Sequence, residues 1–500
     1  MKKEPQKKST SSISRRSFIA TSAAATAGFT VLPSNVIAGL GHRAPSDKLN
    51  IAGVGIGGRG GADIKALRSE NIVALCDVDW DYAAGNFAEF PNAKKYWDWR
   101  VMFDEMKDSI DAVVVGTPDH SHAIASIHAM KMGKHVYCEK PLTHSVWESR
   151  EMTRVAKEYK VATQMGNQGN SGEGIRQICE WIWDGAIGEI REVHAWTNRP
   201  IWPQGLQRPK VGEWPPDTLN WDLFIGPAKM KPYHHILHPW NWRGWWDYGT
   251  GALGDMACHI LDPIFKSLRL QYPIKVQASS TQFNTECAPV AEVVKYTFPA
   301  REKYKKVKMP EVEVTWWDGG LLPPRPEDHP DGEILGRDSN GGCMFLGSKG
   351  KIMCGTYAIN PFLLPLSLDE SYTRPAPSLR RVMNGTEGHH MDWVRACKES
   401  PENRVEASSN FGYAGPLNEM VVMGVLAVRM QDLKKELEWD GKNMQFTNIG
   451  ENEDLRIVTS DKFDVIDGHP HFDTQYTDPM NARAFAAELI KHTYRKGWTL

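Results

Sequence analysis

Three side chains in this sequence have the types and spacing that a hydride-transfer reaction needs. Lys140 follows the apolar run Val136–Cys138 and precedes Pro141, which predicts a lysine held at the end of a buried strand. Asp255 and His259 are spaced i, i+4, so they share one face of a helix. When hydride leaves the carbon of an alcohol, the oxygen must also lose its proton. A neutral imidazole can accept that proton, and a nearby ammonium group can stabilise the developing alkoxide.

Upstream of Lys140 lies a glycine-rich loop of the kind that binds a dinucleotide. Residues 48–54 are expected to form a buried strand, and the next six residues fit the pattern G-x-G-x-x-G. Glycines there allow a tight turn and close approach to pyrophosphate, and the following helix directs its N-terminus at that phosphate. We therefore predict that the loop residues Gly55, Gly57, Gly58, Arg59 and Gly60 bind the cofactor.

An acidic residue at the end of the next strand bears on which dinucleotide binds. The apolar run 72–76 ends at Asp77, which is 22 residues after Gly55. A carboxylate at this place accepts hydrogen bonds from the adenosine ribose and repels a 2′-phosphate. Arg59 in the glycine loop argues in the other direction. The sequence predicts NAD as the cofactor, with NADP less favoured.

The alternation of strands and helices continues beyond this point. Residues 110–116 and 135–138 form continuous apolar runs, as strands of a parallel sheet do, and residues 123–132 between them are predicted to be helical. Ligands of such sheets bind at the carboxyl ends of the strands. The residues predicted to lie in the cofactor crevice for this reason are Thr117, Pro118, His122, Glu139, Lys140, Asn167 and Gln168.

These motifs resemble those of the Gfo/Idh/MocA oxidoreductase family over about residues 47–430. The stretches that carry the resemblance are 55–60, Asp77, 117–122, Glu139-Lys140-Pro141, 249–259 and, more loosely, 347–350. The resemblance implies an α/β protein with an N-terminal Rossmann domain and a C-terminal α/β domain. The second domain has a large, open, mostly antiparallel sheet that covers the nicotinamide. The resemblance extends to an exported branch common in genomes of the Bacteroidetes and Planctomycetes type.

By this resemblance, three residues surround the reacting carbinol. His259 is expected to be the general acid/base, Lys140 a second polar group on the reacting oxygen, and Asp255 an acceptor or orienter of substrate hydroxyls. Whether Lys140 or His259 takes the proton stays open at this level. His390 is expected to contact the ligand as well, because late segments of the family return to the active site.

The chain contains 19 tryptophans, and several fall near the predicted site. They can pack in a core or present flat faces to a sugar ring. The segment 198–243 is too long for an ordinary connection and is interpreted as a substrate-binding insertion. Trp245, Trp246 and Tyr248, which follow it, are predicted to contact substrate. His234, His235 and His238 lie close in sequence, but we predict no bound metal because such histidines can equally contact sugar hydroxyls.

The composition limits the classes of function. With 500 residues, 41% of them hydrophobic, the chain can form two or three domains with a large core. The net charge of −2 gives no electrostatic case for binding nucleic acid. The 8 cysteines lie singly without CxxC spacing, so the sequence indicates neither a structural zinc site nor a thioredoxin motif.

The N-terminus predicts export rather than fold. Residues 14–19, Ser-Arg-Arg-Ser-Phe-Ile, match the twin-arginine motif, and an Ala-rich run too short for a membrane span leads to a small-residue cleavage site after Ala38. The expected product is periplasmic and has no membrane anchor. The predicted organisation is a signal peptide (1–38), an NAD-binding Rossmann domain (47–166), a substrate and oligomerisation domain (167–440) and a C-terminal extension (441–500).

Three functional hypotheses follow. The first is an NAD-dependent oxidoreductase that acts on a hydroxyl of a sugar, glycoside or polyol, including oxidation at C3 of a glycoside. Free NAD is scarce outside the cytoplasm, so its cofactor would be tightly bound and recycled. The second is a glycoside hydrolase that works by transient oxidation, elimination, hydration and reduction. The third is a non-catalytic sugar or nucleotide sensor. The protein is expected to form a homo-oligomer, either a dimer or a tetramer.

Overall fold

The computed structural model describes residues 47–500, and residues 49–500 form one compact unit. The predicted export signal and its cleavage site lie outside the described residues. The first sheet has six parallel strands in the order β3-β2-β1-β4-β5-β6. Its strands are β1 (Asn50–Val54), β2 (Asn71–Cys76), β3 (Lys94–Tyr96), β4 (Ala112–Val115), β5 (His135–Cys138) and β6 (Thr163–Met165).

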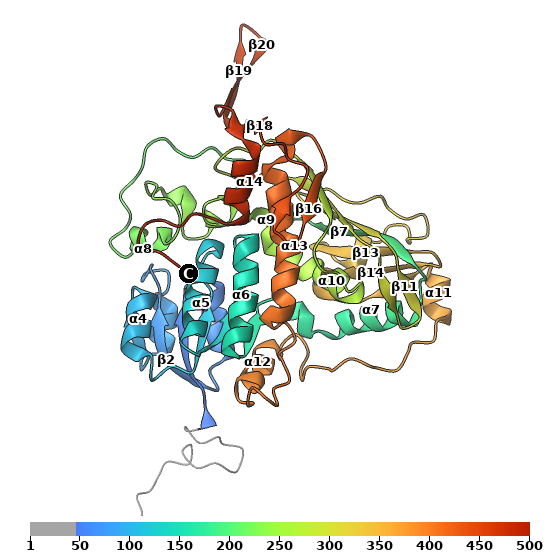
Figure 1. The fold of residues 1–500 in the computed structure, drawn as a ribbon, viewed down its shortest axis with the longest axis horizontal. Helices are drawn as coiled ribbons and strands as arrows, with labels where there is room; N and C mark the ends of the chain where they lie inside the picture. The colour runs from blue at the N-terminus through green and yellow to red at the C-terminus, as the bar shows by residue number, and fades with distance from the viewer. Residues whose placement is uncertain (1–46) are drawn as a thin grey trace, which may run out of the picture. The chain divides into compact units, whose positions relative to one another are not determined.

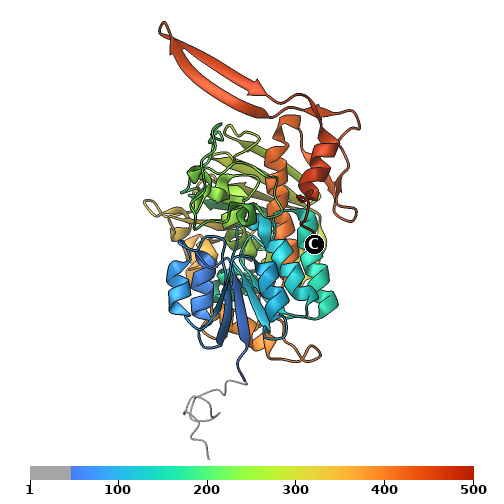
Figure 2. The ribbon, with the colours of Figure 1, turned by 90° about the vertical axis from the view of Figure 1, so that its left-hand side faces the viewer.

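Helices cover both faces of this sheet (Figure 2). They are α2 (Arg59–Ala66), α3 (Ala84–Glu89), α4 (Trp99–Met106), α5 (His122–Lys131) and α6 (Val146–Tyr159). Because both faces are covered, the central strands are apolar throughout, and every residue of β4 is buried. α6 begins at a capping box. The Ser145 side chain accepts the backbone N–H of Glu148, and the Glu148 side chain accepts the backbone N–H of Ser145. The predicted Rossmann topology is confirmed.

The second sheet has nine strands in the order β15-β14-β13-β7-β12-β9-β8-β16-β17. Only β7 and β12 pair in parallel among the neighbours described in this sheet, so it is mostly antiparallel, as predicted. The strands are β7 (Ile190–Thr197), β8 (Lys275–Ser280), β9 (Glu292–Phe298), β12 (Val312–Trp317), β13 (Gly341–Gly347), β14 (Lys351–Gly355), β15 (Phe362–Leu364), β16 (Leu437–Asp440) and β17 (Gln445–Phe446).

A long apolar helix joins the two sheets. α13 (Phe411–Arg429) packs against α6 of the Rossmann domain and against α9 and β8 of the second domain (Figure 1). Among residues 47–500 it is the one helix long and apolar enough to cross a membrane, and 83% of its apolar window is buried. A helix that is apolar on all sides is a core helix when protein surrounds it.

The remaining helices lie around the second sheet and in the connections. They are α7 (Glu173–Asp184), α8 (Trp221–Ile225), α9 (Gly251–Ile260), α10 (Asp262–Ser267), α11 (Leu366–Ser371), α12 (His389–Cys397) and α14 (Ala482–Ile490). Three small two-stranded sheets complete the fold: β10 (Arg301–Tyr304) with β11 (Val307–Met309), β18 (Asp454–Leu455) with β21 (Met480–Asn481), and β19 (Val458–Ile466) with β20 (His469–Tyr476).

The C-terminal residues return to the Rossmann domain. α14 contacts α13, and the chain then runs to Trp498, which is buried. The Trp498 ring lies 6.2 Å from that of Trp99 and 4.2 Å from the guanidinium carbon of Arg100. The end of the chain therefore packs against α4 of its own subunit.

Candidate active site

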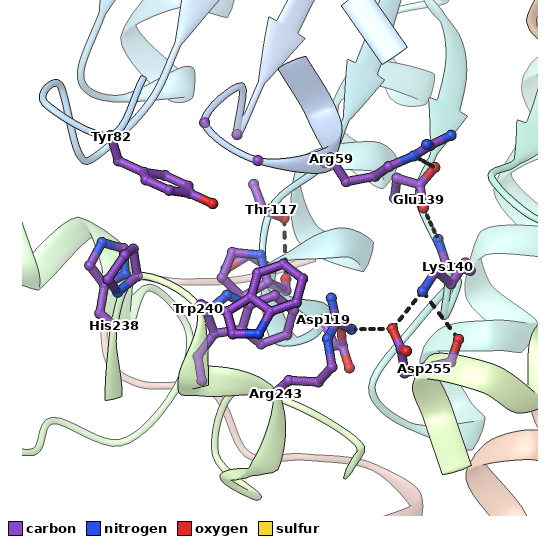
Figure 3. A pocket seen from close by; sticks show the side chains of 18 of the residues that line it. Arg59, Tyr82, Thr117, Asp119, Glu139, Lys140, His238, Trp240, Arg243 and Asp255 are labelled. Atoms are coloured by element: carbon purple, nitrogen blue, oxygen red, sulfur yellow. Dashed lines mark hydrogen bonds and ion pairs between the residues drawn. The ribbon is translucent and has the colours of Figure 1, made fainter. Parts of the chain in front are cut away.

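A cavity of about 340 Å³ lies at the carboxyl ends of the Rossmann strands. The glycine loop and the ends of β2, β4 and β5 form one wall, and α9 with residues 199–243 forms the other (Figure 3). This is the position at which an open parallel sheet binds a ligand. The cavity therefore brings the two groups of predicted residues, from both domains, to one place.

The glycine loop needs glycine at two positions for steric reasons. Gly55 has a φ of +74°, and a Cβ atom there would lie 2.7 Å from the backbone nitrogen of Thr117. A Cβ atom on Gly60 would lie 2.0 Å from the carbonyl oxygen of Gly55. The loop can therefore turn tightly and pass close to β4 only without side chains.

Asp77 holds this loop in place. Its Oδ2 accepts hydrogen bonds from the backbone N–H groups of Ile56 (2.7 Å) and Gly57 (2.9 Å). Burial raises the pKa of Asp77 to about 6, while these amide hydrogen bonds lower it. Tyr82 lies over the same loop, since a Cβ atom on Gly57 would come within 2.3 Å of its ring. The carboxylate thus stands at the end of the loop where the adenosine ribose was predicted.

Arg59 extends from the glycine loop toward two acidic side chains, Glu139 and Asp63. Its Nε lies 3.3 Å from Oε1 of Glu139, and its Nη2 lies 3.1 Å from Oδ1 of Asp63 (Figure 3). Burial, followed by the neighbouring carboxylate of Asp63, raises the pKa of Glu139 to about 7 against the lowering effect of the Arg59 charge. Arg59 compensates these two buried acids, and this pairing removes the argument for a 2′-phosphate contact.

Lys140 and Asp255 meet across the cavity. The Lys140 Nζ donates to Oδ1 of Asp255 at 2.6 Å and to its backbone oxygen at 3.1 Å. Arg243 Nη1 lies 3.1 Å from the same Oδ1 (Figure 3). Burial would raise the pKa of Asp255, but the charges of Arg243 and Lys140 outweigh it and hold that pKa well below its usual value. Asp255 is therefore an ionised carboxylate between two cations.

His259 lies one helical turn beyond Asp255 on α9 and lines the cavity. Its buried Nδ1 has no hydrogen-bond partner among the described residues, and its ring meets the ring of Tyr357 edge-on at 4.5 Å. Burial, followed by the positive charge of Lys140, lowers the pKa of His259 well below 6.5. The imidazole is therefore neutral at neutral pH, as a proton acceptor requires.

The other residues predicted in the cofactor crevice divide into two sets. Thr117, Pro118 and Gln168 line the cavity. His122 is buried, with its ring nitrogens 2.7 Å from the carbonyl oxygens of Pro141 and Thr117. The amide of Asn167 donates to Oδ2 of Asp262 at 2.9 Å. His122 thus holds the backbone that follows β4 and β5, and Asn167 links the chain after β6 to α10.

The predicted substrate contacts lie behind the cavity wall. Trp245, Trp246 and Tyr248 are 1%, 4% and 0% exposed and pack in apolar clusters. His390 is buried, with Nε2 2.9 Å from Oδ1 of Asp63. The cavity wall of the structure thus differs from the predicted one. These aromatic side chains face inward because the irregular chain preceding α9 directs them into the core.

Other aromatic residues from the insertion form the wall instead: Trp202, Trp240 and Trp242. Arg243 stands among them, with its guanidinium carbon 4.4 Å from the Trp242 ring. Asp119 is a further lining residue, whose Oδ2 accepts from Thr250 Oγ1 at 2.6 Å. The predicted insertion 198–243 was the only sequence feature that pointed to this wall. The spacing of residues did not single out Arg243 within the insertion or Asp119 within the stretch 117–122.

Part of the insertion crosses the cavity to reach the Rossmann domain, and we name residues 217–240 the crossing segment. The N–H of Trp80 donates to the carbonyl oxygen of Thr218 at 2.9 Å. His238 Nε2 lies 2.8 Å from Oδ2 of Asp79. Both contacts are on the loop that follows β2 and Asp77. The crossing segment therefore closes over the end of the cavity where Asp77 lies.

A group of three possible metal ligands lies elsewhere. Within residues 47–500, the ligand atoms of Glu213, His234 and His235 are within 4.8 Å of one another. His234 Nδ1 accepts the backbone N–H of Ile236 at 3.2 Å, and its Nε2 lies 3.4 Å from Oε1 of Glu213. The residues that line the cavity belong to a different set.

Two family models match the chain, one for each domain. Residues 48–167 match the "Oxidoreductase family, NAD-binding Rossmann fold" model, and residues 190–302 match the "Oxidoreductase family, C-terminal alpha/beta domain" model. Both are models of the Gfo/Idh/MocA family. The matches include the glycine loop, Asp77, Lys140, Asp255 and His259.

Individual relatives are similar over part of their length. Levoglucosan dehydrogenase of Pseudarthrobacter phenanthrenivorans is 27% identical over 197 residues, which are 39% of this chain and 42% of that protein. Glycosyl hydrolase family 109 protein 1 of Akkermansia muciniphila is 28% identical over 280 residues, 53% of this chain and 52% of that protein. The chain spans about a third of the length of the first curated relatives it matches.

A solved structure shares the fold. The WlbA dehydrogenase from Bordetella pertussis, solved in complex with NADH and UDP-GlcNAcA, has a TM-score of 0.52 at 16% identity and covers 79% of this chain and 99% of its own. At this identity the likeness concerns the fold alone. The two matched stretches, 48–167 and 190–302, place these parts of the chain in the Gfo/Idh/MocA oxidoreductase family.

Proposed function

We propose that this protein is an NAD-dependent oxidoreductase that acts on a hydroxyl group of a sugar, glycoside or polyol. One observation carries the proposal: a neutral, unpartnered His259 and the Lys140–Asp255 ion pair line the same cavity as the glycine loop. The names of relatives such as levoglucosan dehydrogenase support the choice of substrate class. The intact set of reactive residues favours an enzyme over a non-catalytic sensor.

The chain's residues can divide the reaction between them. Bound NAD would supply the acceptor for the hydride that leaves the carbinol carbon. His259 would accept the hydroxyl proton on its ring, since its lowered pKa keeps the imidazole in the neutral form and the residue lines the cavity. Lys140 donates a hydrogen bond that stabilises the negative charge developing on the oxygen. Asp255 holds the Lys140 ammonium in place and can accept a neighbouring substrate hydroxyl.

The preference for NAD rests on the two ends of the glycine loop. Asp77 places an acidic group at the ribose end, and Arg59 is engaged with Glu139 and Asp63 instead of being free for a 2′-phosphate. Asp77, the loop glycines, Thr117 and Gln168 would hold the dinucleotide. The lining of the cavity fits this group, because glycines without side chains leave the backbone open to a pyrophosphate.

We further propose that the cofactor stays bound between turnovers. The crossing segment lies on the loop after β2 through His238 and Thr218, which supports this because it would cover the adenosine end of a bound dinucleotide. Export by the twin-arginine route to the periplasm, proposed from residues 14–19, would make such retention necessary. Successive oxidation and reduction of two substrates would then recycle the cofactor.

Removing the two reactive groups should abolish turnover. We expect His259→Ala and Lys140→Ala each to lower kcat by about 10²- to 10⁴-fold on any identified sugar substrate, as loss of a general base or of an oxygen-stabilising donor does. His235→Ala, at a ring outside the cavity, is the matched control. Because the His259 pKa is well below 6.5, this imidazole should add no acid limb to alcohol oxidation from pH 8 down to about 6, the range in which Glu139 and Asp77, with pKa values of about 7 and about 6, titrate. An acid limb centred at or above 6.5 that persists in Glu139→Gln, or full activity in both variants, contradicts these roles.

The Asp77 carboxylate should set the choice of dinucleotide. Asp77→Ala is expected to weaken NADH binding by about tenfold or more, which corresponds to about 1.4 kcal/mol, and to leave NADPH binding little changed. The reason is that the variant loses both the ribose acceptor and the repulsion of a 2′-phosphate. Fluorescence titration of cofactor-free protein measures both affinities, with the exposed Asp81→Ala as control. A variant that keeps the full preference for NADH would exclude this role.

Retention of the cofactor can be tested on protein purified without added NAD. We expect close to one NAD per chain, released on denaturation and identified by absorbance and mass. His238→Ala removes the hydrogen bond to Asp79 and should speed release about tenfold in a dilution experiment, since bonds to charged groups contribute about 1.5–3 kcal/mol. His235→Ala, in the same segment, should not change the rate. Recovery of unmodified protein that neither retains nor binds NAD defeats the proposal.

A second candidate is a glycoside hydrolase that uses NAD transiently. The similarity to a family 109 glycosyl hydrolase over 280 residues favours it. In this reaction His259 and Lys140 would serve the oxidation and the final reduction, so the net change is hydrolysis without a pair of catalytic carboxylates.

A panel of nitrophenyl glycosides distinguishes the two reactions. We expect oxidation to yield a keto-glycoside, visible by mass as a loss of two hydrogens, with the aglycone still attached. Release of nitrophenol together with the unoxidised sugar, in protein that keeps its NAD in the oxidised form, would instead establish the hydrolase. His259→Ala must suppress either product, because both reactions begin with the same oxidation.

A further inference from the structure

Residues 491–498, which follow α14, run back across the Rossmann domain, and we name them the strap. In Figure 1 this dark red stretch leaves α14 and passes beside α8. Two contacts fix its first half on α6. The Tyr494 hydroxyl donates to Glu148 Oε1, and the Lys491 ammonium lies 4.2 Å from the centre of the Trp147 ring. The strap is thus attached to the helix that follows the Lys140 loop.

The second half of the strap is attached to α4, beside the cavity. The Trp498 ring lies 6.2 Å from that of Trp99, and the guanidinium carbon of Arg100 lies 4.2 Å from the centre of the Trp498 ring. Trp99 is itself one of the residues that line the cavity. The strap therefore packs against a side chain of the Rossmann wall.

Between these two attachments, Arg495 binds the crossing segment. Its Nη1 donates to Oδ1 of Asp222 at 2.6 Å, and its Nη2 and Nε donate to the carbonyl oxygens of Asp222 at 3.1 Å and Gly226 at 3.0 Å. The backbone N–H of Arg495 donates to the carbonyl oxygen of Pro227 at 2.9 Å. One strap residue thus holds α8 and the two residues after it, at the helix end where carbonyl oxygens lack intrahelical partners.

The helix that Arg495 holds is part of the cavity wall. Leu223 and Phe224 of α8 line the cavity, and the Phe224 ring meets that of His238 edge-on at 4.7 Å. His238 in turn is bonded to Asp79, on the loop that follows Asp77. The contacts of Arg495 are therefore continuous, through α8, with the contact that closes the cavity near Asp77.

The packing between α8 and the chain around α4 is incomplete. An open hollow of about 510 Å³ is lined by Trp97, which precedes α4, and by Trp221 and Asp222 of α8. The strap contacts both sides, since Arg495 reaches Asp222 and Trp498 reaches Trp99. It thus connects the two walls where they leave a space between them.

We propose that the strap holds the crossing segment closed over the adenosine end of the cavity, and that Arg495 is the residue that positions α8. The inference rests on the proposed function, because the cavity is there proposed to hold and retain NAD. Arg495 is outside the described set of residues that line the cavity, so it acts through Leu223 and Phe224. Opening the cover then requires the loss of the bonds to Arg495 as well as the bond between His238 and Asp79.

Loss of the Arg495 side chain tests the proposal on protein loaded with NADH. Release of NADH after dilution into excess NAD, followed by fluorescence, should be about tenfold faster in Arg495→Ala, because three side-chain hydrogen bonds to α8 and its end are lost. The kcat on an identified substrate with NAD in excess should be unchanged, since the reacting groups stay in place. Arg495→Lys keeps a charge for Asp222 and should recover part of the slow release. Lys496→Ala, which removes an exposed charge from the next residue, is the matched control.

Hydrogen exchange of the cofactor-free full chain tests the strap independently of the proposed function. The amides of Phe224 and Gly226, which donate to Asn220 and Asp222, should exchange about tenfold faster in Arg495→Ala, and those of α14 should keep their rate. Unmodified protein that binds no NAD would defeat the proposed function and leave this measurement valid. Unchanged exchange in α8, unchanged NADH release, or an equal effect of Lys496→Ala would each overturn the role of the strap. So would a fall in kcat together with the melting temperature, which indicates a structural role alone.

Discussion

The ion pair between Lys140 and Asp255 is the constraint on which the site depends. Lys140 follows β5 of the Rossmann sheet and Asp255 lies on α9 of the second domain, so the pair forms only when both layers are correctly placed. A buried ion pair gains little net stability, because desolvation offsets the attraction. Its value is positional: it fixes the ammonium where the oxygen of a substrate would lie.

Neighbouring contacts support this pair from two sides. On one side, the buried Asn418 of α13 accepts the N–H of Leu142 at 2.9 Å and donates to Thr143 Oγ1 at 2.9 Å, which fixes the backbone just after Lys140. On the other, Arg243 shares the carboxylate of Asp255 and is itself held among tryptophan rings. The core helix and the insertion therefore position the same two charges from opposite directions.

Local patterns explain which parts of this arrangement could be predicted from sequence. The Rossmann sheet follows from continuous apolar runs, and the glycine loop from steric needs that act within a few residues, so both were confirmed. The aromatic wall could not be predicted, because the sequence around residues 240–245 has no hydrophobic periodicity. Such a pattern would be needed to show that Trp240 faces the cavity and Trp245 faces the core. The ion pair between Arg243 and Asp255 depends on how the loop between these two residues folds.

One segment of the chain, the insertion, contributes to both ends of the cavity. Trp240 and Arg243 line the half of the cavity near Asp255, and His238, two residues before Trp240, is bonded to the loop that follows Asp77. A displacement of this segment would move both the wall near the reacting groups and the cover over the adenosine end. Because the backbone between residues 238 and 243 is short, these two movements cannot be independent. Entry of a substrate and release of a cofactor would therefore draw on the same motion, and a site that keeps the segment closed favours retention of the dinucleotide over free exchange.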